Sequence, residues 1–329
     1  MEQNVIIVDS HQGPYLEEPD IERGVLSPEA RPILHRVNSA EELIGLVDDA
    51  AAIISWHTIP LPASVIARLK NCRGIVRSAA GYDNIDIDYA AQRGIPVAVV
   101  PDYGIEEVAD HTMALLLALV RKLHVVGPRA KNGEWDWRAV GRVPRLRGLC
   151  LGLVGFGRIG SAVARRAQAF GLQVAFYDPY LPSGVEKVHA VTRHETLHDL
   201  LDWSQIVSVH VPLTAETRHL IGRAELARLT PETILINTAR GDVIDQQALI
   251  ESLAAGHVGQ VGLDVLSGEP HVPDALRTSE RVLLTPHSAF YADASLAEVR
   301  YKAAATVRRL LSGQPERNIV NGVAPRPRP

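Results

Sequence analysis

The sequence predicts an α/β fold of doubly wound parallel sheets, and two observations support this. Short apolar runs alternate with helical patterns along nearly the whole chain, as in proteins that alternate strands and helices. The predicted strands are residues 5–8, 51–54, 74–76, 97–100, 151–154, 174–177, 206–209 and 234–236. Because these runs are almost entirely apolar, rather than alternating in polarity, we expect helices to cover both faces of the sheets.

Two long helical segments, residues 106–122 and 296–311, flank the middle of the chain and are natural crossovers between domains. We therefore expect two Rossmann-like doubly wound domains, one inserted into the other. The inserted domain is predicted to span residues 103–291. Residues 1–102 and 292–329 would form a discontinuous substrate domain, and the cleft between the two domains would be the active site.

The composition excludes several classes of protein. The 329 residues carry 34 basic and 38 acidic side chains, a net charge of −4, so no basic field attracts nucleic acid or an anionic membrane. The longest apolar run, residues 113–120, is too short to span a bilayer. Cys72 and Cys150 have no metal-ligand spacing, and buried thiols suit a reducing compartment. We expect a cytoplasmic protein without a bound metal.

A glycine motif indicates the ligand of the inserted domain. The apolar run 149–154 leads directly into Gly155-Phe-Gly157-Arg-Ile-Gly160, and a helical pattern follows over residues 161–170. In such a motif the first glycine allows a tight turn, the second lets the backbone approach phosphates, and the third lets the helix pack on its strand. The free N–H groups of that helix would bind the pyrophosphate of a dinucleotide.

Asp178 ends the next predicted strand, at about the 20-residue spacing expected of a carboxylate that accepts the adenosine ribose hydroxyls. This carboxylate favours NAD over NADP, because it repels a 2′-phosphate and the following residues, 179–181, contain no arginine to bind one. The alternative is a surface aspartate that closes a strand.

Three ionisable residues follow predicted strands, where ligands bind in open α/β sheets. Arg240 offers a rigid fork that can bind a carboxylate and polarise a neighbouring carbonyl oxygen. His287 follows the run 282–284 and can exchange a proton near neutral pH. Glu269 could orient that imidazole and stabilise its cation. Each alone could be an ordinary loop or surface residue, so their combination carries the prediction of a catalytic group.

Together these motifs resemble the D-isomer-specific 2-hydroxyacid dehydrogenases, over residues 5–322. The resemblance rests on Ala80-Gly-Tyr-Asp-Asn-Ile-Asp86, Glu107-Val-Ala-Asp110, the glycine motif, Asn237-Thr-Ala-Arg-Gly241, Gly262-Leu-Asp-Val265, Gly268-Glu-Pro270 and Thr285-Pro-His287. Four segments are most similar to the C-terminal-binding-protein branch of the family: Trp56-His-Thr-Ile59, Val76-Arg77, Tyr177-Asp-Pro-Tyr-Leu181 and Pro286-His-Ser-Ala-Phe-Tyr291.

The resemblance implies roles for particular residues. His287 would be the acid/base, Glu269 its partner, and Arg240 the group that binds the substrate carboxylate and carbonyl. Other substrate contacts would come from Arg77 and from the backbone N–H groups of Ala80 and Gly81, with Trp56 and His57 as further pocket residues. Implied cofactor contacts are Gly155, Gly157, Arg158, Ile159, Gly160, Asp178, Pro212, Thr217, Thr238, Ala239, Arg240, Asp264, His287 and Phe290.

The predicted reaction is hydride transfer between NAD and a (D-)2-hydroxy acid, with the matching 2-keto acid as product. Two alternatives stay open. One is an NAD(H)-sensing, corepressor-like binding protein, and the other is a dehydrogenase of a different small anion such as a phosphonate or phosphite. The family resemblance also implies a homodimer, and segment 127–147, with Trp135 and Trp137, could form an arm that crosses between subunits.

Overall fold

The computed structural model describes residues 3–326. The chain divides into two compact units, the first formed by Met1–Tyr103 with Ala292–Pro329 and the second by Gly104–Tyr291. The chain passes from the first unit to the second between residues 103 and 104 and returns between residues 291 and 292. The second unit is therefore an insertion in the sequence of the first.

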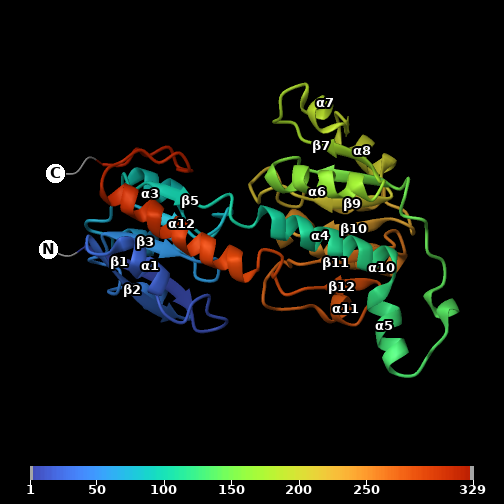
Figure 1. Ribbon diagram of the computed structural model, residues 1–329, viewed down its shortest axis with the longest axis horizontal. Helices are drawn as coiled ribbons and strands as arrows, with labels where there is room; N and C mark the ends of the chain where they lie inside the picture. The colour runs from blue at the N-terminus through green and yellow to red at the C-terminus, as the bar shows by residue number, and fades with distance from the viewer. Residues whose placement is uncertain (1–2, 327–329) are drawn as a thin grey trace. The chain divides into compact units, whose positions relative to one another are not determined.

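The first unit is built on a five-stranded, fully parallel sheet with the order β2-β1-β3-β4-β5 (Figure 1). Its strands are β1 (Gln3–Ser10), β2 (Ala30–Val37), β3 (Ala52–Ser55), β4 (Ile75–Arg77) and β5 (Val97–Val99). The strand order reverses between β1 and β3, which makes this a doubly wound sheet.

Helices cover both faces of this sheet. On one face α1 (Asp20–Leu26) and α12 (Asp293–Leu311) bury a core that includes Ile7, Ile54 and Val307. On the other face η1 (Glu41–Leu43), α2 (Ala63–Ile66) and α3 (Ile87–Gln92) bury a second core. The continuous apolar runs in β1, β3, β4 and β5 follow from this double covering, because most side chains of these strands are buried on both faces of the sheet.

The second unit contains a seven-stranded, fully parallel sheet with the order β12-β11-β10-β9-β6-β7-β8 (Figure 1). Its strands are β6 (Cys150–Val154), β7 (Gln173–Tyr177), β8 (Thr192–Arg193), β9 (Ile206–Val209), β10 (Ile234–Asn237), β11 (Gln260–Leu263) and β12 (Val282–Leu284). The chain adds β7 and β8 on one side of β6, then returns to add β9 to β12 on the other. The switch point between β6 and β9 is where a doubly wound sheet binds its ligand.

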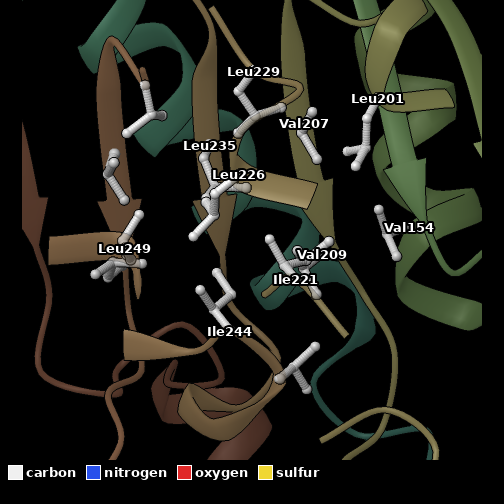
Figure 2. Packing of buried hydrophobic residues seen from close by; sticks show 14 of the residues in the cluster. Val154, Leu201, Val207, Val209, Ile221, Leu226, Leu229, Leu235, Ile244 and Leu249 are labelled. Atoms are coloured by element: carbon white, nitrogen blue, oxygen red, sulfur yellow. The ribbon is translucent and has the colours of Figure 1, made fainter. Parts of the chain in front are cut away.

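The faces of this sheet are covered by α4 (Ile105–Val120) and α6 (Arg158–Ala169) on one side. On the other side lie α8 (Leu197–Trp203), α9 (Arg223–Leu226) and α10 (Gln246–Ala255). Figure 2 shows this second core, in which Leu226 and Leu249 from the helices pack against Val209 and Leu235 from the strands. The remaining helices are short: α5 (Leu123–Lys131), η2 (Trp137–Val140), α7 (Val185–His189), η3 (Gly241–Val243) and α11 (Asp274–Arg277).

The predicted fold class is confirmed, and the structure adds three strands for which no bounds were predicted. β2 is an edge strand that contains Pro32, which is tolerated there because one side of an edge strand needs no ladder hydrogen bonds. β8 has only two residues, and β11 starts with the polar Gln260 and contains Gly262, so its apolar pattern is weak. The predicted helix 106–122 ends earlier, at Val120, because Lys122 adopts a left-handed conformation with φ of 53°.

Candidate active site

The glycine motif forms a tight turn between β6 and α6. Gly155 has φ of +92°, and a Cβ there would lie 2.8 Å from the carbonyl oxygen of His210, so only glycine fits. A Cβ at Gly160 would lie 2.4 Å from the carbonyl oxygen of Gly155. At Gly157, by contrast, a Cβ would meet no described atom within 4 Å. The chain itself leaves this position open, so a bound phosphate can approach the exposed backbone of Gly157 and Arg158 at the start of α6.

Asp178 follows β7 directly and faces the glycine turn. Its Oδ2 accepts a hydrogen bond from the backbone N–H of Phe156 at 2.9 Å, and its Oδ1 accepts one from the N–H of Tyr180 at 3.1 Å. An ionised carboxylate has about four acceptor positions, so two remain for the hydroxyls of a ribose. The half-buried carboxylate and the glycine turn therefore lie where this fold binds the adenosine ribose and the pyrophosphate of a dinucleotide.

The loop after β9 forms the other side of the switch point. His210 donates its backbone N–H to the carbonyl oxygen of Val154 at 2.7 Å, and its Nε2 lies 2.9 Å from Oγ of Ser208. Desolvation lowers the pKa of His210 to about 3, so the imidazole is neutral. Farther along, Thr217 donates its hydroxyl to the carbonyl oxygen of Pro212, which closes the loop on itself.

Arg240 lies in the loop after β10. Asn237, the last residue of β10, holds this loop: its side chain accepts the N–H of Ala239 and donates to the carbonyl oxygen of Arg240 at 2.8 Å. The guanidinium of Arg240 donates to the carbonyl oxygen of Ala239. A Cβ at Gly241 would lie 2.0 Å from the carbonyl carbon of Leu266. The loops after β10 and β11 are therefore in direct backbone contact.

Glu269 and His287 form a hydrogen-bonded pair. Nδ1 of His287 lies 2.8 Å from Oε2 of Glu269, and Oε1 of the same carboxylate accepts the N–H of Leu266 at 2.8 Å. The two side chains are 23% and 30% exposed, so the pair is held in place and still reachable. Because β10, β11 and β12 are adjacent and parallel, Arg240, Glu269 and His287 all follow strands at the same edge of one sheet.

Asp264 fixes the backbone that carries the histidine. Its carbonyl oxygen accepts the N–H of His287, and its carboxylate accepts the N–H groups of Ser288 and Ala289, both at 2.9 Å. His287 itself has φ of 52°, an uncommon conformation for a residue with a side chain. The side chain of Asp264 is turned toward this loop and the residue is only 2% exposed, so it holds the histidine loop in its strained shape.

Two residues of this network were not singled out from the sequence. Thr285 donates its hydroxyl to Oδ1 of Asp264 at 2.6 Å, and Nε2 of His111 lies 2.9 Å from the same hydroxyl oxygen. Because that hydroxyl gives its proton to Asp264, the imidazole of His111 is the donor in the second bond. Thr285 belongs to the motif Thr285-Pro-His287, whereas His111 lies on α4 and only the tertiary fold brings it here.

The other predicted cofactor residues of this unit lie at the same sheet edge. Thr238 is 8% exposed, and its hydroxyl lies 3.0 Å from that of Thr112 on α4. Phe290 makes an edge contact with His287, with ring centroids 6.4 Å apart. Ile159 is half-buried in the first turn of α6. Thr238 and Phe290 thus flank the loops that hold Arg240 and His287.

The predicted substrate residues of the first unit gather around Asn84. Arg77, the last residue of β4, is 2% exposed and donates from Nε to Oδ1 of Asn84 at 3.0 Å. The amide of Asn84 in turn donates to the carbonyl oxygens of Trp56, at 2.9 Å, and of His57, at 3.2 Å. The ring of Trp56 stacks on Tyr15 with centroids 4.3 Å apart. The loop of Ala80 and Gly81 follows β4 directly.

Comparison with known proteins shows the family of the chain. The family model for "D-isomer specific 2-hydroxyacid dehydrogenase, NAD binding domain" matches residues 113–289, more than half of the chain. The chain is 37% identical to a glyoxylate reductase of Korarchaeum cryptofilum over 88% of this chain and 89% of that protein. It is 34% identical to a D-3-phosphoglycerate dehydrogenase of Methanocaldococcus jannaschii, over 85% of this chain but only 53% of that longer protein.

A solved structure is similar along nearly its whole length. The D-lactate dehydrogenase of Aquifex aeolicus, crystallised with NAD and lactic acid, superposes with a TM-score of 0.87 at 29% identity, covering 97% of this chain and 99% of that one. Among the residues that the structure describes, no helix is long and apolar enough to cross a membrane. The chain belongs to the D-isomer specific 2-hydroxyacid dehydrogenase family and is an NAD-dependent oxidoreductase.

Proposed function

We propose that the protein interconverts a small D-2-hydroxy acid and its 2-keto acid, with His287 as the acid/base. The observation that carries this proposal is the 2.8 Å pair of His287 and Glu269, which follows two adjacent strands next to the strand that leads to Arg240. Bound NAD supplies the hydride acceptor, and NADH the hydride donor. The chain has to move the proton and stabilise the charge that develops on the substrate oxygen.

Each residue has a defined part in this proposal. Glu269 holds Nδ1 of His287, so Nε2 is the ring nitrogen that exchanges a proton with the substrate hydroxyl. The carboxylate of Glu269 stabilises the imidazolium that exists after the proton is taken up. The guanidinium of Arg240 binds the substrate carboxylate and the reacting oxygen, because its fork presents parallel donors.

Cofactor binding would use the groups whose geometry fits a dinucleotide. The backbone of Gly157 and Arg158 would bind the pyrophosphate, and Asp178 would accept the ribose hydroxyls of NAD. Thr238, Ala239 and Phe290 would lie near the nicotinamide. For the substrate, Arg77 and the N–H groups of Ala80 and Gly81 remain the contacts that we propose from the first unit.

The test is NADH oxidation by the purified protein with a panel of 2-keto acids: glyoxylate, hydroxypyruvate, pyruvate and phenylpyruvate. We expect turnover with at least one of them, and loss of turnover in His287→Ala while NADH still binds. A matched control is His219→Ala, which removes an exposed histidine of the same unit. NADH binding without turnover of any keto acid would instead support the NAD-sensing, C-terminal-binding-protein-like role. Reduction of NAD+ with phosphite as the electron donor, followed in a separate assay, would support the other-anion alternative.

We also propose that the protein is a homodimer. Trp135 and Trp137 are 91% and 82% exposed within a segment that links α5 to β6. Large exposed aromatic side chains are typical of interaction surfaces. We expect a dimer in sedimentation experiments and a shift toward monomer in the double variant Trp135→Ser, Trp137→Ser. A wild-type monomer would refute this assignment.

For localisation we propose the cytoplasm. Both Cys72 and Cys150 are free thiols, and free thiols persist in reducing compartments. Burial raises the pKa of Cys72 to about 12, which keeps it protonated and unreactive. Cell fractionation checks this proposal, and recovery of the protein outside the cytoplasm would contradict it.

A further inference from the structure

Arg193 is a part-buried arginine that the proposed reaction does not use. It is the last residue of β8, at the edge of the seven-stranded sheet, where it pairs with Phe176 of β7. Its side chain is only 14% exposed. A buried guanidinium is costly unless its N–H groups find partners, so the partners that it has indicate what it does.

The guanidinium of Arg193 donates hydrogen bonds to backbone carbonyl oxygens of the loop that begins at Asp178. Nη1 donates to the carbonyl oxygens of Asp178, at 3.3 Å, and Leu181, at 3.2 Å, and Nη2 donates to that of Pro182 at 2.8 Å. Nε donates to the carboxylate of Glu186 at 3.3 Å. Four bonds from one side chain thus define the course of residues 178–182.

A column of rings connects the same guanidinium to the glycine turn. Cζ of Arg193 lies 4.9 Å from the centroid of the Phe176 ring, which stacks on Phe156 with centroids 4.2 Å apart. Phe156 stands between the first two glycines of the motif, and its backbone N–H is the group that donates to Asp178 at 2.9 Å. His189 closes the column with an edge contact to Phe156. Arg193 therefore contacts the backbone of Asp178 directly, and it contacts the N–H donor residue Phe156 through the ring of Phe176.

We propose that Arg193 is a positioning residue for the adenosine end of NAD, acting through the loop of Asp178. This inference rests on the proposed role of Asp178 as the acceptor of the ribose hydroxyls. Two acceptor positions of that carboxylate are occupied by N–H groups of the chain, so the other two are useful only if the carboxylate keeps one orientation. Arg193 donates a hydrogen bond to the backbone carbonyl oxygen of Asp178 and so fixes the backbone from which the carboxylate projects.

Lysine cannot replace arginine in this arrangement. The three backbone carbonyls and the Glu186 carboxylate are reached by different nitrogens of one planar group, and an ammonium has a single nitrogen. Lysine would keep the positive charge near Phe176 but would release part of the loop. The substitution Arg193→Lys therefore removes the fork and leaves the charge in place.

The experiment measures direct binding of NADH, ADP-ribose and reduced nicotinamide mononucleotide to the full-length wild type and to Arg193→Lys. We expect the Kd for NADH and for ADP-ribose to rise by about tenfold, because the carboxylate loses its fixed orientation. The Kd for reduced nicotinamide mononucleotide, which lacks the adenosine end, should stay within about twofold. The matched control is Arg228→Lys, which alters an arginine–carboxylate pair with Asp202 on the surface of the same unit.

A second variant separates an effect on the loop of Asp178 from a general loss of stability. Glu186→Gln leaves the three carbonyl bonds of Arg193 in place and removes the charge of its carboxylate partner. We expect about a threefold rise in the Kd for ADP-ribose in this variant. Where a keto acid is turned over, KM for NADH should rise in Arg193→Lys while kcat changes by less than about twofold.

Unchanged Kd values for NADH and ADP-ribose in Arg193→Lys would overturn the inference, even if the variant melted at a lower temperature. An equal loss of affinity for all three ligands would also overturn it, because the effect would then not be confined to the adenosine end. Failure of the proposed reaction gives a different result, since the wild type would bind NADH and ADP-ribose and turn over no keto acid.

Discussion

Acidification should destabilise the second unit through His210. The imidazole lies at the switch point between β6 and β9, next to Ser208, and its pKa of about 3 is well below the value of 6.5 for an exposed histidine. As the pH falls, the unfolded chain therefore takes up the proton before the folded chain does. His210 makes its full contribution to the free energy of unfolding above about pH 6.5. This contribution is lost progressively as the pH falls from about 6.5 to about 3.

The size of the effect follows from the two pKa values. At about pH 5 the unfolded histidine is almost fully protonated and the folded one is not, which corresponds to a loss of about 2 kcal/mol in the free energy of unfolding. The residue as a whole keeps some contact with solvent, which reduces the penalty for charging the ring. We therefore expect a loss of about 1–2 kcal/mol at this pH relative to about pH 7.5.

The assay compares the wild type with His210→Asn, which can still bond with Ser208 but does not titrate. Urea unfolding is followed by pulsed hydrogen exchange and mass spectrometry, so peptides from β9 report the second unit and peptides from β3 report the first. The stability difference between the two proteins should shrink by about 1–2 kcal/mol on going from about pH 7.5 to pH 5, in the β9 peptides only. An unchanged difference at the two pH values would refute the reasoning.

Three further predictions concern activity, binding and stability. Glu269→Gln keeps the size of the side chain and removes its charge, so kcat should fall by about 10- to 100-fold while KM for the keto acid changes little; an unchanged kcat would contradict the proposed role. Gly160→Ala places a Cβ 2.4 Å from the carbonyl oxygen of Gly155, so the turn must shift, and the Kd for NADH in a fluorescence titration should rise by about tenfold or more. Wild-type NADH affinity in that variant would show that the turn tolerates the shift. Leu235→Ala removes a fully buried side chain of β10 and should cost about 2–5 kcal/mol in urea unfolding, and a cost below about 1 kcal/mol would mean that the core in Figure 2 repacks.

The sequence allowed prediction of the strands that have helices on both faces, because burial on both faces demands continuous apolar residues. It did not indicate β2, whose position at the sheet edge permits Pro32 and exposed charged residues such as Arg31. β8 is too short for any pattern, and its two residues pair with β7 only because the loop between them folds back.

The placement of the candidate site followed from one physical rule, that the carboxyl ends of parallel strands lie at one edge of a sheet. Arg240, Glu269 and His287 each follow such a strand in the structure, although their roles remain predictions. His111 and Arg193 could not be found in this way. Each acts through contacts with residues distant in the sequence, and no local spacing records such contacts.

The backbone contact at Gly241 limits how this protein can vary. Because the chain at Gly241 touches the chain at Leu266 with no room for even a methyl group, the loop of Arg240 and the loop of Glu269 must move as one body. Side chains on the two loops can be exchanged, but an inserted residue in either loop would separate Arg240, the proposed substrate-binding residue, from Glu269, the proposed partner of the acid/base. Efforts to alter the substrate range should therefore keep the lengths of these two loops and change side chains instead.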